Sequence, residues 1–480
     1  MLKCSLRKTQ TVILFQKRIL NVENGLLLPV AVKGKTPEQF TLVDRMQKYH
    51  TPGISIAVIN NGTIEWAKGY GYIDSTGGKL VNIRTLFQAG SISKAMSATA
   101  ALNFVQNGIL KLDEDINKNL LSWKIPENDF TIRKKVTLRQ ILCHSAGITV
   151  HGFPGYEYND TIPTLLQILN GEKPCNTVPV IVDIIPGSKY RYSGGGYTVL
   201  QEVLIDAGKK SFPLLMNENL ISKIRMKNTL FAAILPAKYQ NNVAFGHELN
   251  GMKAKGNWNH YPELAAAGGW STPFDLALLA VEIQKGYNGK SNKILSPKTI
   301  REMLSPQINQ NQGLGWELAG SVNSFRFFHA GDTRGYKCKM IAYTSNGKGA
   351  VVMANSDDAV RLIDEILRSI AKEYNWPGFL PKEKEIISVD TSLISEYLGT
   401  YALEIAPGIQ IVITLEDSTL YTEVIQPSGK QREALYPESK TKFFSLTSNF
   451  GIEFFHDKDK IRYLIIHQTQ DEDYKANKIK

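Results

Sequence analysis

The stretch Gly90-Ser91-Ile92-Ser93-Lys94 joins an apolar run, residues 85–89, to a helix-like segment, residues 95–106. A serine at the start of a helix has its backbone N–H in a positive field, and a lysine three residues later lies on the same helix face. The lysine amine can then take the hydroxyl proton that an isolated serine keeps at neutral pH. A helix with an ordinary N-capping serine shows the same pattern, so the rest of the chain decides between the two interpretations.

A second motif, Tyr192-Ser193-Gly194, lies in a glycine-rich loop that follows the turn Pro186-Gly187. A helical pattern of apolar residues follows it, from Val199 to Leu204. The phenol of Tyr192 can serve as a general base if a neighbouring cation lowers its pKa from about 10. The alternative is a glycine-rich turn that holds a structural aromatic side chain.

The third motif, His329-Ala330-Gly331, is predicted at a strand edge that turns into a second strand, residues 339–343. Small residues at a strand edge let a substrate carbonyl approach backbone N–H donors, as an oxyanion hole requires. A half-buried histidine with satisfied hydrogen bonds is the alternative interpretation of His329.

In this order the three motifs resemble those of the class C β-lactamase and penicillin-recognising serine hydrolase family, which includes carboxylesterases and D-aminopeptidases. The S-x-x-K spacing of Ser91 and Lys94 is typical of such enzymes, and the likeness runs from about residue 40 to about residue 375. Further segments that resemble the family are 51–58 with 69–72, 136–148, 267–276 and 313–316. The resemblance implies a covalent acyl-enzyme mechanism without a cofactor or metal.

The resemblance also implies a role for each motif residue. Ser91 is the expected nucleophile, and Lys94 and Tyr192 are expected to share the proton transfers as a coupled pair. The backbone N–H groups of Ser91 and of Asp332, which follows Gly331, are expected to hold the oxyanion. His329 is expected to line the pocket.

Two departures from the family's β-lactamases bear on the substrate. Gly194 stands where they commonly have the asparagine of Tyr-x-Asn, and His329-Ala330-Gly331 stands where they commonly have Lys-Thr-Gly. A histidine with an ordinary pKa near 6.5 is mostly neutral at pH 7, so it anchors a carboxylate less firmly than lysine. Small esters or amides are therefore the expected substrates. A β-lactamase, a D-aminoacyl peptidase, a penicillin-binding module that acylates without turnover and an inactive scaffold are the alternatives.

The order of strand-like and helix-like segments predicts an α+β fold, an antiparallel sheet flanked by helices with a helical insertion. Strands are expected at 54–59, 63–66, 86–89, 325–328, 339–344 and 349–354, with a hairpin turn at Asn60-Asn61-Gly62. A long helical region is expected from 93 to 283 and a helix from 358 to 374. The resemblance leads to the same fold, that of serine β-lactamases and transpeptidases.

Residues 376–381, rich in proline and glycine, precede a charged run and predict a domain boundary. We expect an N-terminal extension or atypical leader at 1–38, the serine hydrolase domain at 39–380 and a C-terminal β-barrel-like domain at 386–480. The last domain is expected to be up-and-down, because short apolar runs alternate with turn residues. Those runs are 409–415, 420–424, 442–446, 452–456 and 461–466.

The chain has 480 residues, a net charge of +11 and a pI near 9.2. This charge is consistent either with peripheral contact with an anionic cell envelope or with an ordinary solvated basic surface. No arginine-rich block suggests nucleic-acid binding. The cysteines are scattered and expected to be free, and no metal-ligand spacing is present; they are Cys4, Cys143, Cys175 and Cys338.

The N-terminus carries two short apolar runs, 11–15 and 25–32, and neither is a clean signal peptide or as long as a transmembrane helix. Periplasmic, secreted or envelope-associated localisation therefore remains open against a cytoplasmic one. The sequence leaves the oligomeric state undetermined.

Overall fold

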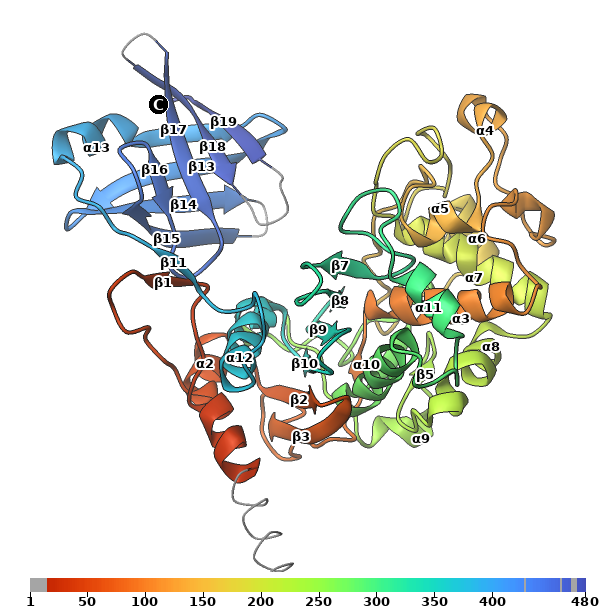
Figure 1. Ribbon diagram of the computed structural model, residues 1–480. Helices are drawn as coiled ribbons and strands as arrows, with labels where there is room; N and C mark the ends of the chain where they lie inside the picture. Colours follow the sequence, from red (N-terminus) through yellow and green to blue (C-terminus); the bar gives the residue numbers. More distant parts are fainter. Residues whose placement is uncertain (1–14, 427–428, 458–459, 468–472) are drawn as a thin grey trace, which may run out of the picture. The chain divides into compact units, whose positions relative to one another are not determined.

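The computed structural model describes residues 15–426, 429–457, 460–467 and 473–480 (Figure 1). The chain divides into two compact units. The first is built mainly from Val43–Ile363 and Tyr374–Gly378, and the second from Gln16–Leu42, Asp364–Glu373 and Phe379–Lys480. The sequence predicted boundaries near residues 38 and 380; in the structure, Gln16–Leu42 and Asp364–Glu373 belong to the second unit.

A six-stranded antiparallel sheet forms the centre of the first unit, in the order β3-β2-β10-β9-β8-β7. The predicted hairpin joins its first two strands, with Asn61 and Gly62 at φ 50° and 68° as a two-residue turn requires. The strands are β2 (Gly53–Asn60), β3 (Thr63–Gly71), β7 (Glu317–Ala319), β8 (Arg326–Thr333), β9 (Tyr336–Tyr343) and β10 (Gly349–Ala354).

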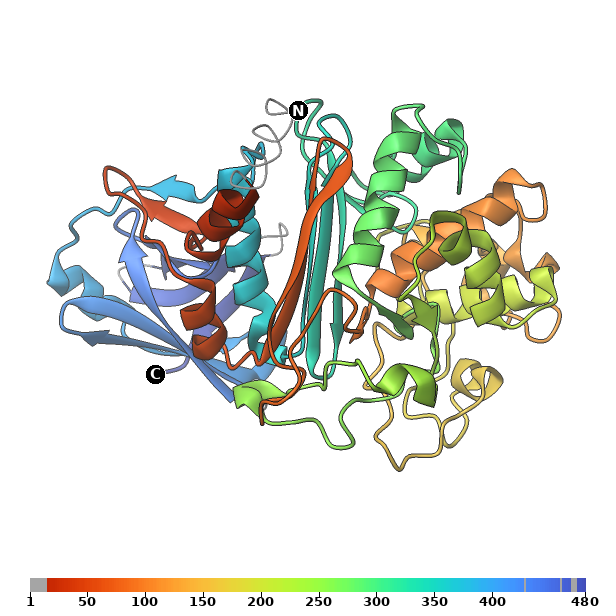
Figure 2. The ribbon, with the colours of Figure 1, turned by 90° about the horizontal axis from the view of Figure 1, so that it is seen from below.

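Helix α10 (Pro273–Tyr287) packs against β2, β9 and β10, and Figure 2 shows it alongside one face of the sheet. Helix α3 (Ile92–Gln106) is buried from Ile92 through Phe104. A helix that is buried on all sides needs small and apolar residues around its whole circumference, and the alanines between 95 and 101 meet this need. Because its surroundings hold α3 firmly, the residues at its start are held firmly too.

The region predicted as a long helical stretch, 93–283, is less regular than expected. Three helices of 15 residues, α3, α7 (Gly194–Gly208) and α10, are separated by shorter elements and loops. A three-stranded sheet, β4 (Phe87–Gln88), β6 (Gly269–Ser271) and β5 (Leu230–Phe231), crosses this region. The shorter helices are α4 (Asp129–Arg133), α5 (Leu138–Leu142), α6 (Leu165–Asn170), α8 (Phe212–Met216), α9 (Ala237–Gln240) and α11 (Pro297–Met303).

The second unit contains a closed eight-stranded barrel, drawn in blue in Figure 1, whose strands follow one another in chain order. The predicted up-and-down β domain is therefore confirmed. Aromatic side chains such as Tyr397 and Phe454, stacked at 4.3 Å, fill its core. The strands are β12 (Gly399–Leu403), β13 (Ala406–Glu416), β14 (Thr419–Gln426), β15 (Gly429–Pro437), β16 (Lys442–Phe444), β17 (Gly451–Asp457), β18 (Lys460–His467) and β19 (Asp473–Lys478).

Residues before and after the hydrolase region meet inside the second unit. Strand β1 (Val30–Val32) pairs in parallel with β11 (Lys382–Lys384). Helix α12 (Val360–Glu373) contributes Arg368 Nε and Ser369 Oγ, which donate to the carbonyls of Leu27 and Val22 at 2.7 and 2.8 Å. Part of the predicted N-terminal extension is thus integrated into the fold.

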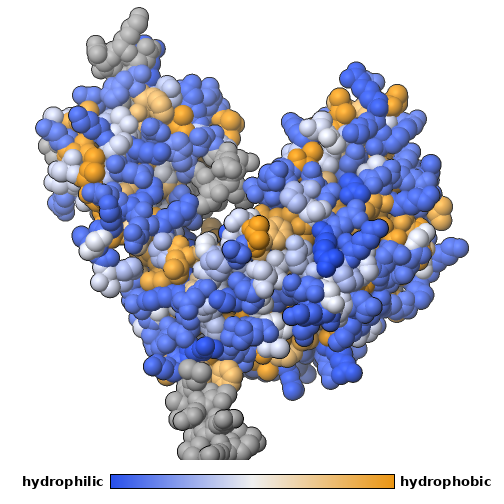
Figure 3. Space-filling model, in the orientation of Figure 1, coloured by the Kyte–Doolittle hydropathy of each residue, from blue (hydrophilic) through white to orange (hydrophobic). Residues whose placement is uncertain are grey.

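The face in Figure 3 is mostly hydrophilic, with smaller apolar groups between the polar side chains. Within the described ranges, no helix is long and apolar enough to cross a membrane, and no cluster of histidine, cysteine and acidic side chains could hold a metal ion. Cys143, Cys175 and Cys338 are free and buried, whereas Cys4 lies outside the described residues.

Candidate active site

Ser91 and Lys94 meet at the start of α3. Lys94 Nζ lies 2.9 Å from Ser91 Oγ and donates a hydrogen bond to the carbonyl of Ala266, also at 2.9 Å. The lysine side chain is buried, and burial lowers its pKa from an ordinary value of 10.5 to about 7. A substantial fraction of Lys94 is therefore a neutral amine at pH 7, which has a lone pair that can accept a proton from Ser91.

The carbonyl of Ala266 owes its position to the segment 266–271. Gly269 N donates to Ser93 Oγ at 3.0 Å, and Ala89 N donates to Gly269 O at 2.8 Å. A Cβ atom on Gly269 would lie 2.8 Å from Ser93 Oγ, so the close approach requires glycine there. This packing ties the segment that carries Ala266 to both sides of Ser91.

Tyr192 completes the group that the sequence predicted. Lys94 Nζ lies 5.0 Å from the centre of its ring. Burial raises the pKa of Tyr192 above its ordinary value of 10.0, and the neighbouring Ser91 side chain only partly offsets this effect. A neighbouring cation that lowers this pKa, as the sequence suggested, is not the dominant influence; burial is. Tyr192 is therefore a neutral phenol at pH 7.

His329 lies on β8 next to this group. It is buried, and burial lowers its pKa to about 4, with Lys94 acting in the same direction. Its Nδ1 lies 2.6 Å from the carbonyl of Ala330. The imidazole is therefore neutral over the whole range from pH 5 to 8, so it offers a substrate carboxylate no positive charge.

The backbone at Gly331 and Asp332 lies close to the start of α3. A Cβ atom on Gly331 would be 2.1 Å from Ala89 O, and one on Gly90 would be 2.7 Å from Asp332 N. Both positions therefore need glycine, and Gly90 also has a φ of +49°. Strand β7 pairs with β8 from Arg326 to Phe328, so the edge of β8 beyond Phe328 extends past its neighbour. The backbone of Asp332 therefore lies against Gly90, the residue before Ser91.

Gly194, the second departure from the β-lactamase pattern, begins α7. A Cβ atom there would lie 2.8 Å from Phe153 Cε2 and 3.1 Å from the carbonyl of His151. The space of an amide side chain is thus occupied by an aromatic edge.

Two contributors to the site carried no specific signal in the sequence. Ala266 acts through its carbonyl, which every residue possesses, so only the tertiary structure reveals it. His144, whose ring stacks on that of Tyr192 at 4.3 Å, lies in the segment 136–148 that resembles the family. That resemblance was the only signal that could have drawn attention to it.

Comparisons with known proteins show which proteins this chain resembles. Penicillin-binding protein 4* of Bacillus subtilis (strain 168) is 21% identical over 472 residues, covering 90% of this chain and 96% of that protein. The octameric penicillin-binding protein homologue from Pyrococcus abyssi superposes with a TM-score of 0.62 at 18% identity, over 91% of this chain and 98% of its own.

A third similar protein is the D-amino acid amidase from Ochrobactrum anthropi SV3, in a complex with L-phenylalanine amide. Its TM-score is 0.56 at 19% identity, over 70% of this chain and 96% of its own. At these identities the two solved structures establish the fold, which is that of the serine β-lactamases and transpeptidases. The family described as Beta-lactamase matches residues 41–372, most of the chain, and the protein therefore belongs to the β-lactamase family.

Proposed function

We propose that this protein is a serine hydrolase that cleaves small esters or amides through a covalent acyl-enzyme at Ser91. One observation carries the proposal: the buried amine of Lys94, with a pKa of about 7, lies 2.9 Å from Ser91 Oγ. A general base is most effective when its pKa is near the operating pH. An N-capping serine with a distant or fully protonated lysine would have no such base.

In the acylation step, the Oγ of Ser91 forms a bond to the substrate carbonyl carbon while its proton passes to Lys94 Nζ. The backbone N–H groups of Ser91 and Asp332 stabilise the oxyanion that develops. The phenol of Tyr192 gives its proton to the leaving alkoxide or amine as the carbonyl carbon–heteroatom bond breaks. The ammonium of Lys94 then restores that proton to Tyr192, which leaves Lys94 neutral again.

In the deacylation step, water attacks the ester carbonyl and loses its proton to the same pair. The bond between the carbonyl carbon and Ser91 Oγ breaks, Oγ takes a proton, and the acid product leaves. Every proton that moves stays among Ser91, Lys94, Tyr192, water and substrate, so no external cofactor is needed.

The walls of the site favour an uncharged substrate with a small apolar group. His329 is neutral, and Phe153 occupies the space beside Gly194. A β-lactam that depends on a fixed cation for its carboxylate would lose a charge-assisted hydrogen bond, which is roughly twice as strong as a neutral one. Hydrolysis of D-aminoacyl amides is a second candidate, supported by the fold that the chain shares with the D-amino acid amidase.

The decisive experiment compares Ser91→Ala with wild-type protein in p-nitrophenyl butyrate hydrolysis and in labelling by a fluorophosphonate probe. We expect both to be abolished with little change in Tm. Ser97→Ala is the matched control, because Ser97 is a buried serine on the same helix whose Oγ donates to Ser93 O and Ala265 O. Full labelling of Ser91→Ala, at any residue, would contradict the proposal. A stoichiometric burst without turnover would instead identify a penicillin-binding module.

A second experiment addresses the substrate class. Wild-type kcat/KM is expected to be higher for p-nitrophenyl butyrate than for a chromogenic cephalosporin at pH 7. The ratio of the two values should be the same at pH 5.5, because His329 stays neutral at both pH values. His329→Lys should shift this ratio toward the cephalosporin several-fold. Faster cephalosporin turnover by the wild type would refute the ester preference.

A further inference from the structure

We propose that His144 is the positioning residue for Tyr192, holding the phenol within reach of Ser91 by accepting hydrogen bonds from the backbone N–H groups of the residues on both sides of it. The inference rests on the proposed function, since it assigns His144 a task in the same proton-transfer chemistry. It adds to that function a residue that touches neither Ser91 nor the reacting carbonyl.

One residue, His144, contacts Tyr192 and both of its neighbours in the chain. Arg191 N donates to the carbonyl of His144 at 2.7 Å, and Ser193 N donates to His144 Nδ1 at 3.1 Å. Between these two hydrogen bonds, the imidazole stacks on the phenol ring, with 4.3 Å between centroids and 30° between planes. The backbone carbonyl and the side chain of His144 thus bind the residues before and after Tyr192, while its ring packs on the phenol.

The protonation state of His144 suits this role. Nδ1 can accept from Ser193 N only when it carries no proton, which places the single proton of the neutral ring on Nε2. Burial lowers the pKa of His144 well below 6.5, and Lys94, His329 and His151 add to the effect. The acceptor is therefore retained throughout the pH range in which Lys94 titrates.

The turn that carries His144 has further hydrogen bonds to the Tyr192 loop. The guanidinium of Arg191 donates to the carbonyl of Gly147 at 2.5 Å, and Ser193 Oγ donates to the carbonyl of Thr149 at 2.9 Å. The residues that flank Tyr192 are thus bound through both backbone and side chain, and they bind to a single short segment, 144–149.

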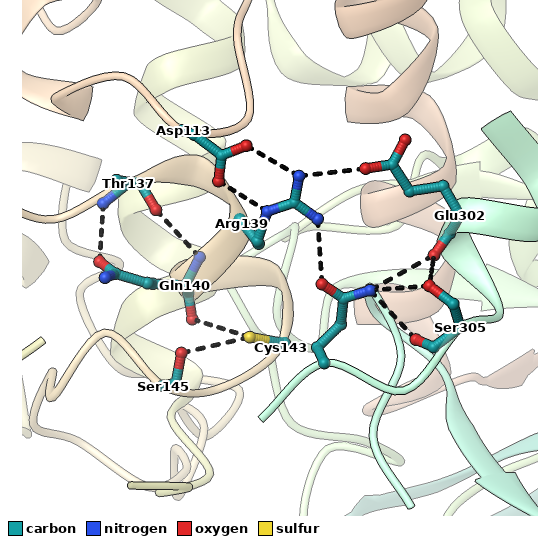
Figure 4. Close-up of polar contacts among 9 residues, drawn as sticks. Asp113, Thr137, Arg139, Gln140, Cys143, Ser145, Glu302 and Ser305 are labelled. Carbon is teal, nitrogen blue, oxygen red and sulfur yellow. Dashed lines mark hydrogen bonds and ion pairs between the residues drawn. The ribbon is translucent and has the colours of Figure 1, made fainter. Parts of the chain in front are cut away.

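That segment is in turn anchored through α5, which ends one residue before Cys143. Thr137 and Gln140 cap the start of α5 reciprocally. Arg139 holds Asp113 at 2.6 and 2.8 Å and Glu302 at 3.0 Å, as Figure 4 shows. The chain leaves this anchored helix at His144 with a φ of +58°, a conformation in which asparagine and histidine are enriched.

The geometry matters because proton transfer is sensitive to small displacements. The phenol must stay within reach of Ser91, and a misplacement of about 1 Å at a catalytic group can cost about 10²-fold in rate. Tyr192 lies in a loop that leads into α7, and a loop is less rigid than the helix that holds Ser91 and Lys94. Hydrogen bonds that His144 accepts from the backbone N–H groups of both neighbouring residues restrict the motion of Tyr192.

Two substitutions separate the two contacts of the side chain. Asn Oδ1 can take the place of Nδ1 as acceptor and tolerates positive φ, so His144→Asn keeps the hydrogen bond and loses the ring. His144→Phe keeps a ring and loses the acceptor. We expect kcat for p-nitrophenyl butyrate to fall about tenfold in His144→Asn and about 100-fold in His144→Phe, with KM within threefold of wild type. The graded rescue by asparagine distinguishes positioning from general support of the fold.

His247→Asn is the matched control. His247 is also fully buried, and its Nδ1 lies 3.0 Å from the carbonyl of Asn355, outside the group around Ser91. We expect a lower Tm and an unchanged kcat per folded molecule. If both His144 variants likewise lose Tm but keep kcat within threefold of wild type, the positioning role is refuted.

A measurement on the wild-type protein covers the case in which the variants fail to fold. Long-range ¹H–¹⁵N spectra of histidine-labelled protein report which ring nitrogen carries the proton. Tyr192→Phe shifts the signals of the two histidines that pack on its ring, His144 and His151, and His151→Asn removes those of the second. We expect the Nε2-protonated tautomer from pH 6 to 8, and a proton on Nδ1 would overturn the inference. Retained activity in Ser91→Ala would instead refute the proposed function itself, so the two failures are distinguishable.

Discussion

Two lysines of the hydrolase unit, Lys94 and Lys337, are both largely removed from solvent, yet their pKa values move in opposite directions. Lys94 contacts two neutral oxygens, those of Ser91 and Ala266, and burial lowers its pKa to about 7. Lys337 on β9 is also subject to burial, but the carboxylates of Asp332 and Asp357 outweigh it and raise its pKa.

The comparison shows what makes a buried lysine a base. Burial alone disfavours the ammonium, and a carboxylate within hydrogen-bond distance restores it. The Ser91 site supplies hydroxyl and carbonyl oxygens at this lysine, so the amine can lose its proton near neutral pH. The turn between β8 and β9 supplies acidic partners, so Lys337 stays charged and ties the strand end to Asp357.

The largest expected effect is on activity when the base is removed. Lys94→Met should lower kcat/KM for p-nitrophenyl butyrate by about 10²–10⁴-fold, the range typical of general-base catalysis. Lys94→Arg should fare no better, because a guanidinium stays protonated at neutral pH. Steady-state kinetics on folded protein check this, and a Lys94→Met enzyme within threefold of wild type would exclude the role of base.

The same substitution should stabilise the fold at neutral pH. The folded-state pKa of Lys94 is about 7 against 10.5 for an exposed lysine, so the unfolded chain binds more protons between these values and wild-type stability rises with pH there. Lys94→Met should raise the free energy of unfolding by up to about 4 kcal/mol at pH 7. About 1 kcal/mol must be subtracted from this gain for each hydrogen bond that is lost. Urea unfolding at pH 7 and 10 tests this. A gain that does not shrink toward pH 10 would argue against the low pKa.

The rate of acylation should follow the titration of Lys94. Protonated Lys94 cannot accept the Ser91 proton, so the rate should fall about tenfold per pH unit below 7, or about 50-fold between pH 7 and 5. The second-order rate constant of fluorophosphonate labelling measures this step alone. Lys94→Met provides the control, since its residual rate should lack the transition; a wild-type profile that is flat from pH 5 to 8 would contradict the assignment.

The smallest effect is expected at the second lysine. Lys337→Met leaves the carboxylates of Asp332 and Asp357 without their cation and should destabilise the protein by about 2 kcal/mol at pH 7, because the pair is only partly shielded from water. A raised pKa means that the contribution is present below about pH 10.4 and is lost above it. Chemical denaturation at pH 7 measures the change in the free energy of unfolding, which should be opposite in sign to that for Lys94→Met. A change of the same sign in both variants would contradict the contrast between the two lysines.

Much of the hydrolase fold and of the barrel could be predicted from the sequence. The hairpin at Asn61-Gly62 and the strand at 349–354 are encoded locally, by turn residues and by apolar runs of strand length. The helical region was predicted less well, because its short helices are defined by capping residues and tertiary packing rather than by long periodic patterns. Strand β15, whose first four residues are exposed, and β19 gave no apolar run to detect.

The sequence by itself determined which side chains are available for chemistry, since the motifs around Ser91, Tyr192 and His329 can be read from short spacings and their order. Only the tertiary structure decided what those groups are at neutral pH. Burial turns Lys94 into an amine and keeps Tyr192 a phenol and His329 uncharged. It also brings the carbonyl of Ala266 and the ring of His144 to the site from distant segments. Desolvation and distance depend on every element packed around a group, so no local pattern can encode them.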